Sequence, residues 1–207
     1  LESLTSFVPV PDYTTESLDF TGRWLNERNP QRRPIGVGSW MREGREGRTG
    51  HDYTLVQFAL AEGTTLEHGE AWGMSLAWSG NNRHILERTP LGRTSIGAGE
   101  LLLPGEVVLA HDETYEAPTV WAAYSANGIN EASERFHGSV RARRSHSRPR
   151  PVTLNVWEAV YFDHDLTKLS ALAEKAAEIG VERFVLDDGW FGARRDDHAG
   201  LGDWVVS

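Results

Sequence analysis

The sequence predicts two kinds of structure in succession, a β-sandwich domain and then one βαβ unit. In the first part, short apolar or alternating runs are separated by Gly, Pro and Asn, a spacing typical of antiparallel strands. After residue 151, apolar residues recur at helical spacing between two short apolar runs, which indicates strand, helix and strand. We therefore predict an all-β domain over residues 1–150 and a second domain over residues 151–207.

The strands of the first domain are predicted from its apolar runs. Turn signals at residues 61–63, 79–82 and 103–105 separate these runs and fit a sandwich better than a helical bundle. Helical periodicity is nearly absent before about residue 137. The predicted strands include residues 54–60, 73–78, 101–103, 107–110 and 119–125.

A basic segment over residues 141–150 lies at the predicted domain boundary. It contains five Arg and no acidic residue, so phosphate binding is one interpretation. No aromatic residue interleaves the charges, and the chain as a whole is acidic. A solvated linker is therefore the favoured interpretation.

The second domain begins with a predicted buried strand over residues 153–157. A helix follows over residues 166–179 and ends at Gly180, a residue typical of helix C-termini. Residues 183–186 form the next predicted strand. Such a unit joins parallel strands by a right-handed crossover, so it belongs to a barrel or to a doubly wound sheet.

Composition limits the partners and the cellular location. The 207 residues carry a formal charge of -9, which argues against duplex nucleic acid or an anionic membrane as the main partner. Cys is absent, so neither disulfides nor thiolate metal sites are expected. The first ten residues do not resemble a signal peptide, and no run approaches the roughly 20 apolar residues of a membrane span. We expect a cytoplasmic protein, although a chain that begins without Met suggests a fragment, for which the absence of a leader says little.

The candidate site is the acid pair Asp187 and Asp188, followed by Gly189 and Trp190. The pair comes where the second parallel strand ends, and α/β enzymes place ligand-binding groups at such strand ends. Gly189 allows the backbone to turn, so that both carboxylates can reach one ligand. A loop with solvated acids is the alternative.

Acids beside Trp190 and Trp157 point to sugar binding. Carboxylates accept hydrogen bonds from sugar hydroxyls, and indole faces pack on apolar sugar faces. Mg²⁺ or Ca²⁺ binding by the acid pair is a weaker alternative, because the only further acid cluster is Asp196 with Asp197. The sequence contains no His-Glu-x-x-His zinc motif, no Gly-x-Ser-x-Gly elbow and no P-loop.

Longer motifs extend this interpretation to a family. Residues 154–163 (LNVWEAVYFD), 184–191 (FVLDDGWF) and 201–204 (LGDW) resemble the start of the catalytic (β/α)₈ barrel in glycoside hydrolase family 36, the bacterial α-galactosidases. Residues 22–28, 78–81, 103–106 and 135–137 resemble the supersandwich-like N-terminal domain of the same family. The resemblance covers nearly the whole chain.

The resemblance implies a retaining hydrolase that removes terminal α-linked galactose from oligosaccharides such as melibiose and raffinose, without a metal or organic cofactor. It implies that Asp187 and Asp188 hold the galactose 4- and 6-hydroxyls and that Trp157 lines the same pocket. The nucleophile of the family lies in a Lys-x-Asp motif, and no such motif follows the acid pair. Both catalytic carboxylates are therefore expected downstream, and this chain alone is expected to be inactive.

The resemblance also implies a homo-oligomer. Trp24 is similar to a residue that reaches the active site of a neighbouring subunit in tetrameric members of the family. Residues 48–51 (RTGH) depart from the Ser-Ser-His segment of many members, which puts the role of that loop in doubt. Two alternatives remain open: a non-catalytic carbohydrate-binding or structural β-domain, and a galactosyl-transferring relative on the same fold.

Overall fold

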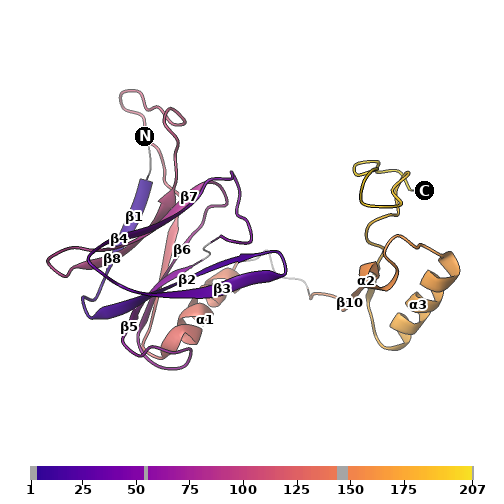
Figure 1. Cartoon of the computed structure of the whole chain (residues 1–207), viewed down its shortest axis with the longest axis horizontal. Coiled ribbons are helices and arrows are strands. Elements are labelled where there is room, and N and C mark those ends of the chain that lie inside the picture. The colour runs from indigo at the N-terminus through magenta and orange to yellow at the C-terminus, as the bar shows by residue number, and fades with distance from the viewer. Residues whose placement is uncertain (1–3, 54–55, 144–148, 207) are drawn as a thin grey trace. The chain divides into compact units, whose positions relative to one another are not determined.

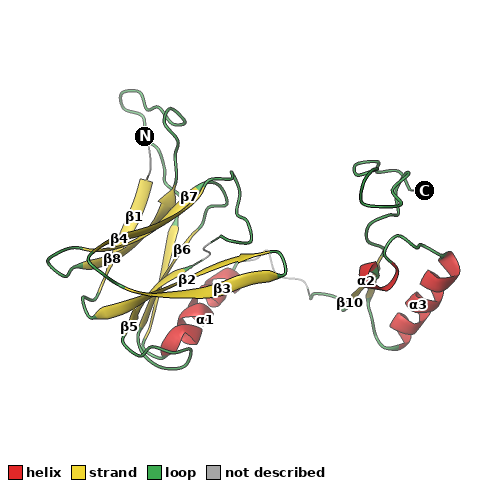
Figure 2. Cartoon of the chain, viewed as in Figure 1, coloured by secondary structure: helices red, strands yellow, loops and turns green. Residues whose placement is uncertain are grey.

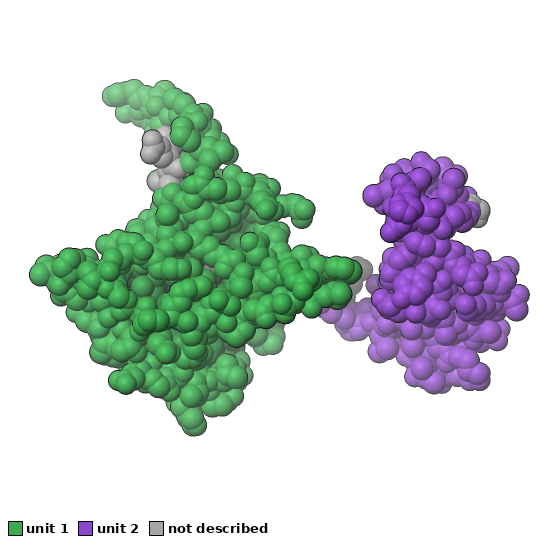
Figure 3. All heavy atoms as spheres, viewed as in Figure 1, with its two compact units in different colours: residues 1–143 green, residues 144–207 purple. Residues whose placement is uncertain are grey.

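The computed structural model describes residues 4–53, 56–143 and 149–206 of the chain. The chain forms two compact units, Leu1–Arg143 and Arg144–Ser207, which Figure 3 distinguishes by colour. Figure 1 labels their helices and strands. Within the described residues, no helix is both long and apolar enough to cross a membrane.

The first unit contains two antiparallel sheets, drawn as yellow arrows in Figure 2. One sheet has the order β1 (Leu4–Val10), β8 (Thr94–Glu100), β7 (Asn82–Arg88) and β4 (Gly38–Gly44). The other has the order β3 (Asn26–Pro34), β2 (Thr14–Arg23), β5 (Gln57–Ala61), β6 (Ala71–Leu76) and β9 (Val120–Ser125).

Alternating side chains build two apolar cores in this unit. One core takes its side chains from both sheets, among them Met74, Leu86 and Ile96. The second core lies on the other face of the β5 sheet, where Phe58 and Leu60 pack against helix α1 (Gly128–Arg141). Neighbouring residues of β5 and β6 thus serve opposite faces of one sheet, as the two-residue period of a strand requires.

Helix α1 corrects the prediction of an all-β domain with strands up to about residue 137. Its buried contacts come from Ile129 and Ala132, with Phe136 packed beside them. These three residues follow helical spacing, but polar residues surround them, so the apolar signal is too sparse to distinguish a helix from a loop. Tertiary packing against the sheet stabilises this helix more than its own composition does.

The predicted strands at residues 101–103 and 107–110 are also wrong, because both segments are loops. Leu101 and Leu102 are buried, so their apolar character reflects packing rather than strand pairing. Val108 is 79% exposed and belongs to neither core. Strands β6 and β9 confirm the predictions at residues 73–78 and 119–125. Strand β5 confirms the prediction at residues 54–60, of which residues 54 and 55 lie outside the described residues.

The second unit contains the predicted βαβ order. Strands β10 (Thr153–Asn155) and β11 (Arg183–Val185) pair in parallel, with Asn155 opposite Val185. Between them lie a short helix α2 (Trp157–Val160) and helix α3 (Leu166–Glu178). Gly180, with φ of +88°, follows the end of α3 and adopts the left-handed conformation that a helix C-terminus favours. The first strand is shorter than predicted, since Trp157 begins α2 instead of ending β10.

Candidate functional site

The site is built where the two parallel strands end. Asn155 is the last residue of β10, and Asp187 comes two residues after β11 ends at Val185. Because the strands are parallel and in register, their carboxyl ends meet at one edge, and the Asn155 Nδ2 amide donates a hydrogen bond to Asp187 Oδ2. Asn155 Oδ1 accepts a hydrogen bond of 2.8 Å from the backbone N–H of Trp157. One amide side chain therefore joins the segments that carry Asp187 and Trp157.

Asp188 is held by a buried arginine. Arg194 Nε lies 3.0 Å from Asp188 Oδ1, and Arg194 Nη2 lies 2.8 Å from Asp188 Oδ2. The side chain of Arg194 is 8% exposed and that of Asp188 is 23% exposed. The hydrogen bond from this guanidinium is the main reason why the pKa of Asp188 lies below its ordinary value, and the backbone N–H of Gly189 acts in the same direction. Asp188 is therefore ionised at neutral pH.

Asp187 has a different environment. The residue is exposed, and its carboxylate accepts a hydrogen bond from the neutral amide of Asn155. An ionised carboxylate has about four lone-pair positions. Asp187 thus keeps acceptor positions that can receive hydroxyl groups from a ligand.

Aromatic rings gather around the acid pair. The Trp157 ring lies edge-on to Tyr161 and Phe162, at centroid distances of 5.2 and 5.0 Å. Phe162 in turn lies 5.6 Å below the guanidinium of Arg194. Gly189, with φ of +89°, permits this closeness, because a Cβ there would lie 2.9 Å from Phe162 Cδ1. The site thus combines carboxylate acceptors with apolar rings, the chemistry that a sugar requires.

The structure brings three of the four predicted site residues into the second unit. Asp187 and Asp188 lie at the predicted strand end, and Asn155 links Trp157 to them. Trp24 belongs to the first unit, in the turn between β2 and β3, and it is 69% exposed. It lines a pocket of about 480 Å³ beside Arg48 and His51, which are part of the segment that departs from the family pattern.

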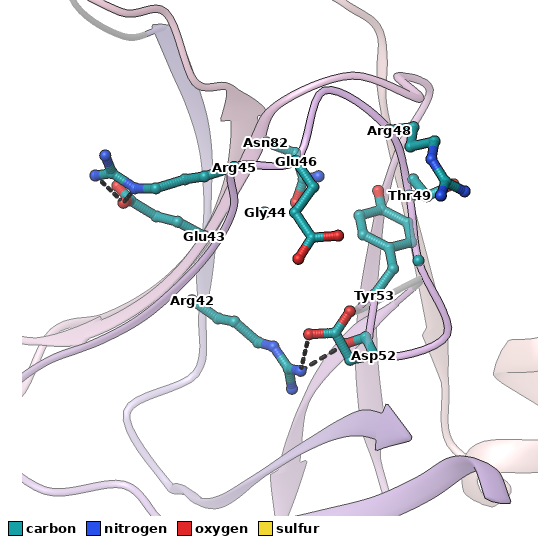
Figure 4. A pocket seen from close by; sticks show the side chains of 11 residues that line it. Arg42, Glu43, Gly44, Arg45, Glu46, Arg48, Thr49, Asp52, Tyr53 and Asn82 are labelled. Atoms are coloured by element: carbon teal, nitrogen blue, oxygen red, sulfur yellow. Dashed lines mark hydrogen bonds and ion pairs between the residues drawn. The ribbon is translucent and has the colours of Figure 1, made fainter. Parts of the chain in front are cut away.

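A second pocket of about 220 Å³ lies close to this loop in the first unit (Figure 4). Its lining is mainly charged, and most of these charges are satisfied by one another: Arg42 lies 3.6 Å from Asp52, and Arg45 pairs with Glu43. The part of the chain that the structure describes holds no group of three or more His, Asp or Glu side chains arranged for a metal ion.

Sequence reasoning missed Asn155 and Arg194. Each is a single polar residue whose partner is defined only when the chain folds: Asn155 bonds an acid 32 positions away, and Arg194 returns from a loop six positions after Asp188. The position of Asn155 directly after an apolar strand was the available signal, since strand ends are where site residues collect. For Arg194, the available signal was a basic residue six positions after the acid Asp188.

Comparisons with known proteins cover nearly the whole chain. Residues 1–110 match the glycosyl hydrolase family 36 N-terminal domain, and residues 114–207 match the family described as melibiase. An α-galactosidase of Escherichia coli is 40% identical over 202 residues, which are 96% of this chain and 28% of that protein.

Solved structures agree with these matches. The GH36 α-galactosidase AgaA from Geobacillus stearothermophilus has a TM-score of 0.82 at 34% identity, covering 97% of this chain and 29% of its own. The α-galactosidase from Lactobacillus brevis has a TM-score of 0.84 at 32% identity, covering 98% and 28%. The chain therefore spans less than a third of the length of these relatives. The predicted fold class, a β-sandwich followed by the start of a (β/α)₈ barrel, is confirmed.

Proposed function

Since the chain belongs to glycosyl hydrolase family 36, we propose that it is the front part of a retaining α-galactosidase. The enzyme would release terminal α-linked galactose from oligosaccharides such as melibiose and raffinose. The similar proteins from Escherichia coli and Geobacillus stearothermophilus are α-galactosidases, and solved structures of AgaA variants hold stachyose or raffinose. Galactose-containing oligosaccharides are accordingly the proposed ligands of this chain.

The observation that carries this proposal is the acid pair at the carboxyl end of β11, next to an aromatic cluster. We propose that Asp187 and Asp188 accept hydrogen bonds from the galactose 4- and 6-hydroxyls, while Trp157 lines the pocket. The axial 4-hydroxyl distinguishes galactose from glucose, so an ionised acceptor at that position confers specificity. A hydrogen bond to a charged group contributes about 1.5–3 kcal/mol.

The two acids are proposed to bind the sugar and not to break the glycosidic bond. Retaining glycosidases need a nucleophile and an acid/base whose carboxyl groups are roughly 5–5.5 Å apart. In this chain, Asp188 is already bound by Arg194, and no Lys follows the pair, so a Lys-x-Asp motif is absent there. We propose that both catalytic carboxylates lie in later barrel strands of the complete enzyme.

Activity and stereochemistry test the proposal together. The complete enzyme, incubated with melibiose or an aryl α-galactoside, is expected to release galactose, and proton NMR is expected to show the α-anomer as the first product. The purified 207-residue chain is expected to show no turnover. Transfer to added sugar acceptors in place of hydrolysis would indicate the galactosyl-transferring relative, and binding without turnover by the complete protein would indicate the non-catalytic alternative.

Trp24 is proposed to serve the substrate site of a neighbouring subunit in a homo-oligomer. Its exposure of 69% is high for Trp, and it lies in a pocket with Arg48 and His51. An exposed indole offers a flat apolar face that can pack on a substrate. Trp24→Ala in the complete enzyme is expected to raise KM for raffinose several-fold without changing the oligomer size measured by light scattering. An unchanged KM would contradict the assignment.

A further inference from the structure

We infer that Arg194 is a positioning residue of the sugar site, one that fixes the Asp188 carboxylate and leaves it a single acceptor position for the substrate. The inference rests on the proposed function, because it concerns the same site. It adds a residue that contacts the acid instead of the sugar, and it makes the two acids unequal.

The contacts of Arg194 show how it holds the carboxylate. Its planar guanidinium places Nε 3.0 Å from Asp188 Oδ1 and Nη2 2.8 Å from Asp188 Oδ2, a bidentate pair. The remaining nitrogen, Nη1, donates to the backbone oxygen of Ala199 at 2.8 Å. All three nitrogens of the guanidinium are thus engaged, and the side chain is almost fully buried. Because the guanidinium is fixed by Ala199 and bonds both carboxylate oxygens, the carboxylate of Asp188 has little freedom to rotate.

The loop that carries Arg194 is itself closed tightly. Gly200 has φ of +79°, and a Cβ there would lie 3.1 Å from the backbone N and Cα of Arg194. Arg195 Nη1 donates to the backbone oxygen of Arg194 at 2.8 Å and to that of Gly189 at 3.3 Å. The close approach of Gly200 and the two hydrogen bonds of Arg195 therefore hold this loop in the shape that places the guanidinium against Asp188.

Counting acceptor positions gives the functional consequence. A carboxylate has about two lone pairs on each oxygen. Asp188 Oδ1 accepts from the N–H of Gly189 at 2.8 Å and from Arg194 Nε, while Oδ2 accepts from Arg194 Nη2 and, at 3.2 Å, shares Nε. Nε–H is one donor shared between the two oxygens, so three N–H donors occupy three of the four positions, and one position remains, on Oδ2. Asp187 has used one position, for Asn155. Asp187 can thus receive two or more hydroxyls, whereas Asp188 receives one in a fixed direction.

Variants of Arg194 in the complete enzyme test this inference. Arg194→Lys keeps the charge and loses the bidentate geometry, and Arg194→Gln loses both. We expect kcat/KM for an aryl α-galactoside to fall roughly ten-fold for Lys and up to about a hundred-fold for Gln. The acid limb of the pH profile is expected to move to higher pH, because Asp188 loses the group that keeps it ionised. Arg183→Gln, at an exposed arginine of β11, is the control and should keep parental kinetics.

A double variant separates positioning from a general structural role. If Arg194 acts through Asp188, then Asp188→Asn combined with Arg194→Gln should be no more impaired than Asp188→Asn alone. Additive losses, or parental kinetics and pH profile in a folded Arg194→Lys enzyme, would overturn the inference. Circular dichroism checks folding, and the Lys variant serves if the Gln variant does not fold.

An NMR titration distinguishes failure of this inference from failure of the proposed function. Carbon-13 NMR of the Asp188 carboxyl in the complete enzyme measures its pKa without requiring turnover. The pKa is expected to be higher in Arg194→Gln than in the parent enzyme, and equal values would contradict the inference. If the pKa moves but the complete protein has no α-galactosidase activity, the contact is real and the proposed function is wrong.

Discussion

Asp187 and Asp188 differ in how the loss of the carboxylate charge would affect the residues around them. Asp187 bonds a neutral amide, so Asp187→Asn replaces one hydrogen-bonding group by another at an exposed position. Asp188 faces a buried guanidinium, so Asp188→Asn would place an amide N–H₂ or a neutral oxygen against a charged donor. The second change leaves a buried charge without its counter-ion, which costs more than the loss of one exposed bond.

Both substitutions are expected to weaken catalysis in the complete enzyme without unfolding it. A lost charged hydrogen bond of about 1.5–3 kcal/mol corresponds to a fall in kcat/KM of roughly ten- to a hundred-fold. We expect Asp188→Asn to show the larger fall and also a lower melting temperature. If both enzymes keep parental kcat/KM, the acids do not bind the sugar, and the interpretation as a solvated loop takes its place.

His84 makes the stability of the first unit sensitive to mild acid. The side chain is fully buried, and neither ring nitrogen has a hydrogen-bond partner among the described residues. Burial, and secondarily the charge of Arg42, lowers the pKa of His84 from 6.5 to about 4. His84 therefore becomes protonated near pH 6.5 in the unfolded chain but only near pH 4 in the folded chain. The free energy of unfolding consequently decreases as pH falls from 6.5 to 4.

Replacing His84 by Phe tests this effect. The pKa difference corresponds to about 3 kcal/mol at most, and His84→Phe should remove this loss between pH 6.5 and 4 in urea unfolding of the 207-residue chain. His137→Gln, at an exposed position of α1, serves as the control. An unchanged pH dependence in the Phe variant would show that the imidazole is not the titrating group.

The sequence predicts the position of a site better than its internal bonds. Asp187 and Asp188 could be located because strand ends can be read from local patterns, whereas Trp157 lies two residues beyond the end of β10 and not at the predicted strand end. The bonds of Asn155 and Arg194 could not, because they depend on strand register and on the path of a loop. For the same reason the unequal roles of the two acids became visible only with the geometry.

At the level of elements, helix α1 shows where local patterns are insufficient. Its N-terminus is stabilised by a network centred on Glu131, whose carboxylate accepts hydrogen bonds from the Ser125 hydroxyl, at 2.7 Å, and from Arg135, at 2.8 Å. Asn127 adds a third bond at 3.1 Å. Ser125 is the last residue of β9, so this network also fixes the helix to the strand before it.

The same network predicts a second acid dependence at lower pH. The hydrogen bond from Ser125, followed by that from Arg135, lowers the pKa of Glu131 from 4.5 to about 2. A lowered carboxylate pKa stabilises the folded state above pH 4.5, and that stabilisation is lost as pH falls from 4.5 towards 2.

Glu131→Gln is expected to lower the melting temperature at neutral pH and to flatten its decline between pH 4.5 and 2. Circular dichroism of the 207-residue chain across this range measures both effects. Glu134→Gln, at an exposed acid of the same helix, should behave like the parent chain. Equal behaviour of the two variants would show that the network adds no stability to α1.

On the scale of the whole molecule, the two units differ in how well they bury apolar side chains. The first unit has two cores formed by sheets and a helix. In the described part of the second unit, the buried apolar residues are Val156, Val160, Ala176 and Phe191. Large apolar side chains there are instead exposed, including Leu166 at 79%, Ile179 at 82% and Trp204 at 67%.

This imbalance is the physical reason to expect unequal stability. Parallel sheets normally have both faces covered by helices, and the described residues of the second unit supply two short paired strands and the helices α2 and α3. In a complete (β/α)₈ barrel, later strands would pair with the open edges and cover the exposed side chains. Without them, open strand edges and apolar surface favour aggregation.

Limited trypsin digestion of the 207-residue chain tests this difference. The basic segment at residues 141–150 contains five Arg, of which Arg148 and Arg150 precede Pro and so resist trypsin. Arg141 and Arg143 are exposed and can be cleaved. We expect the earliest cuts in this segment, after which the first unit persists and the second is rapidly lost by further cleavage or precipitation. Cleavage within a unit requires local unfolding, and a unit with a small buried core unfolds more readily. Mass spectrometry of the time course identifies the products. A fragment beginning near residue 144 that outlasts the N-terminal fragment would contradict this prediction and would show that the short βαβ unit is stable with its apolar side chains exposed.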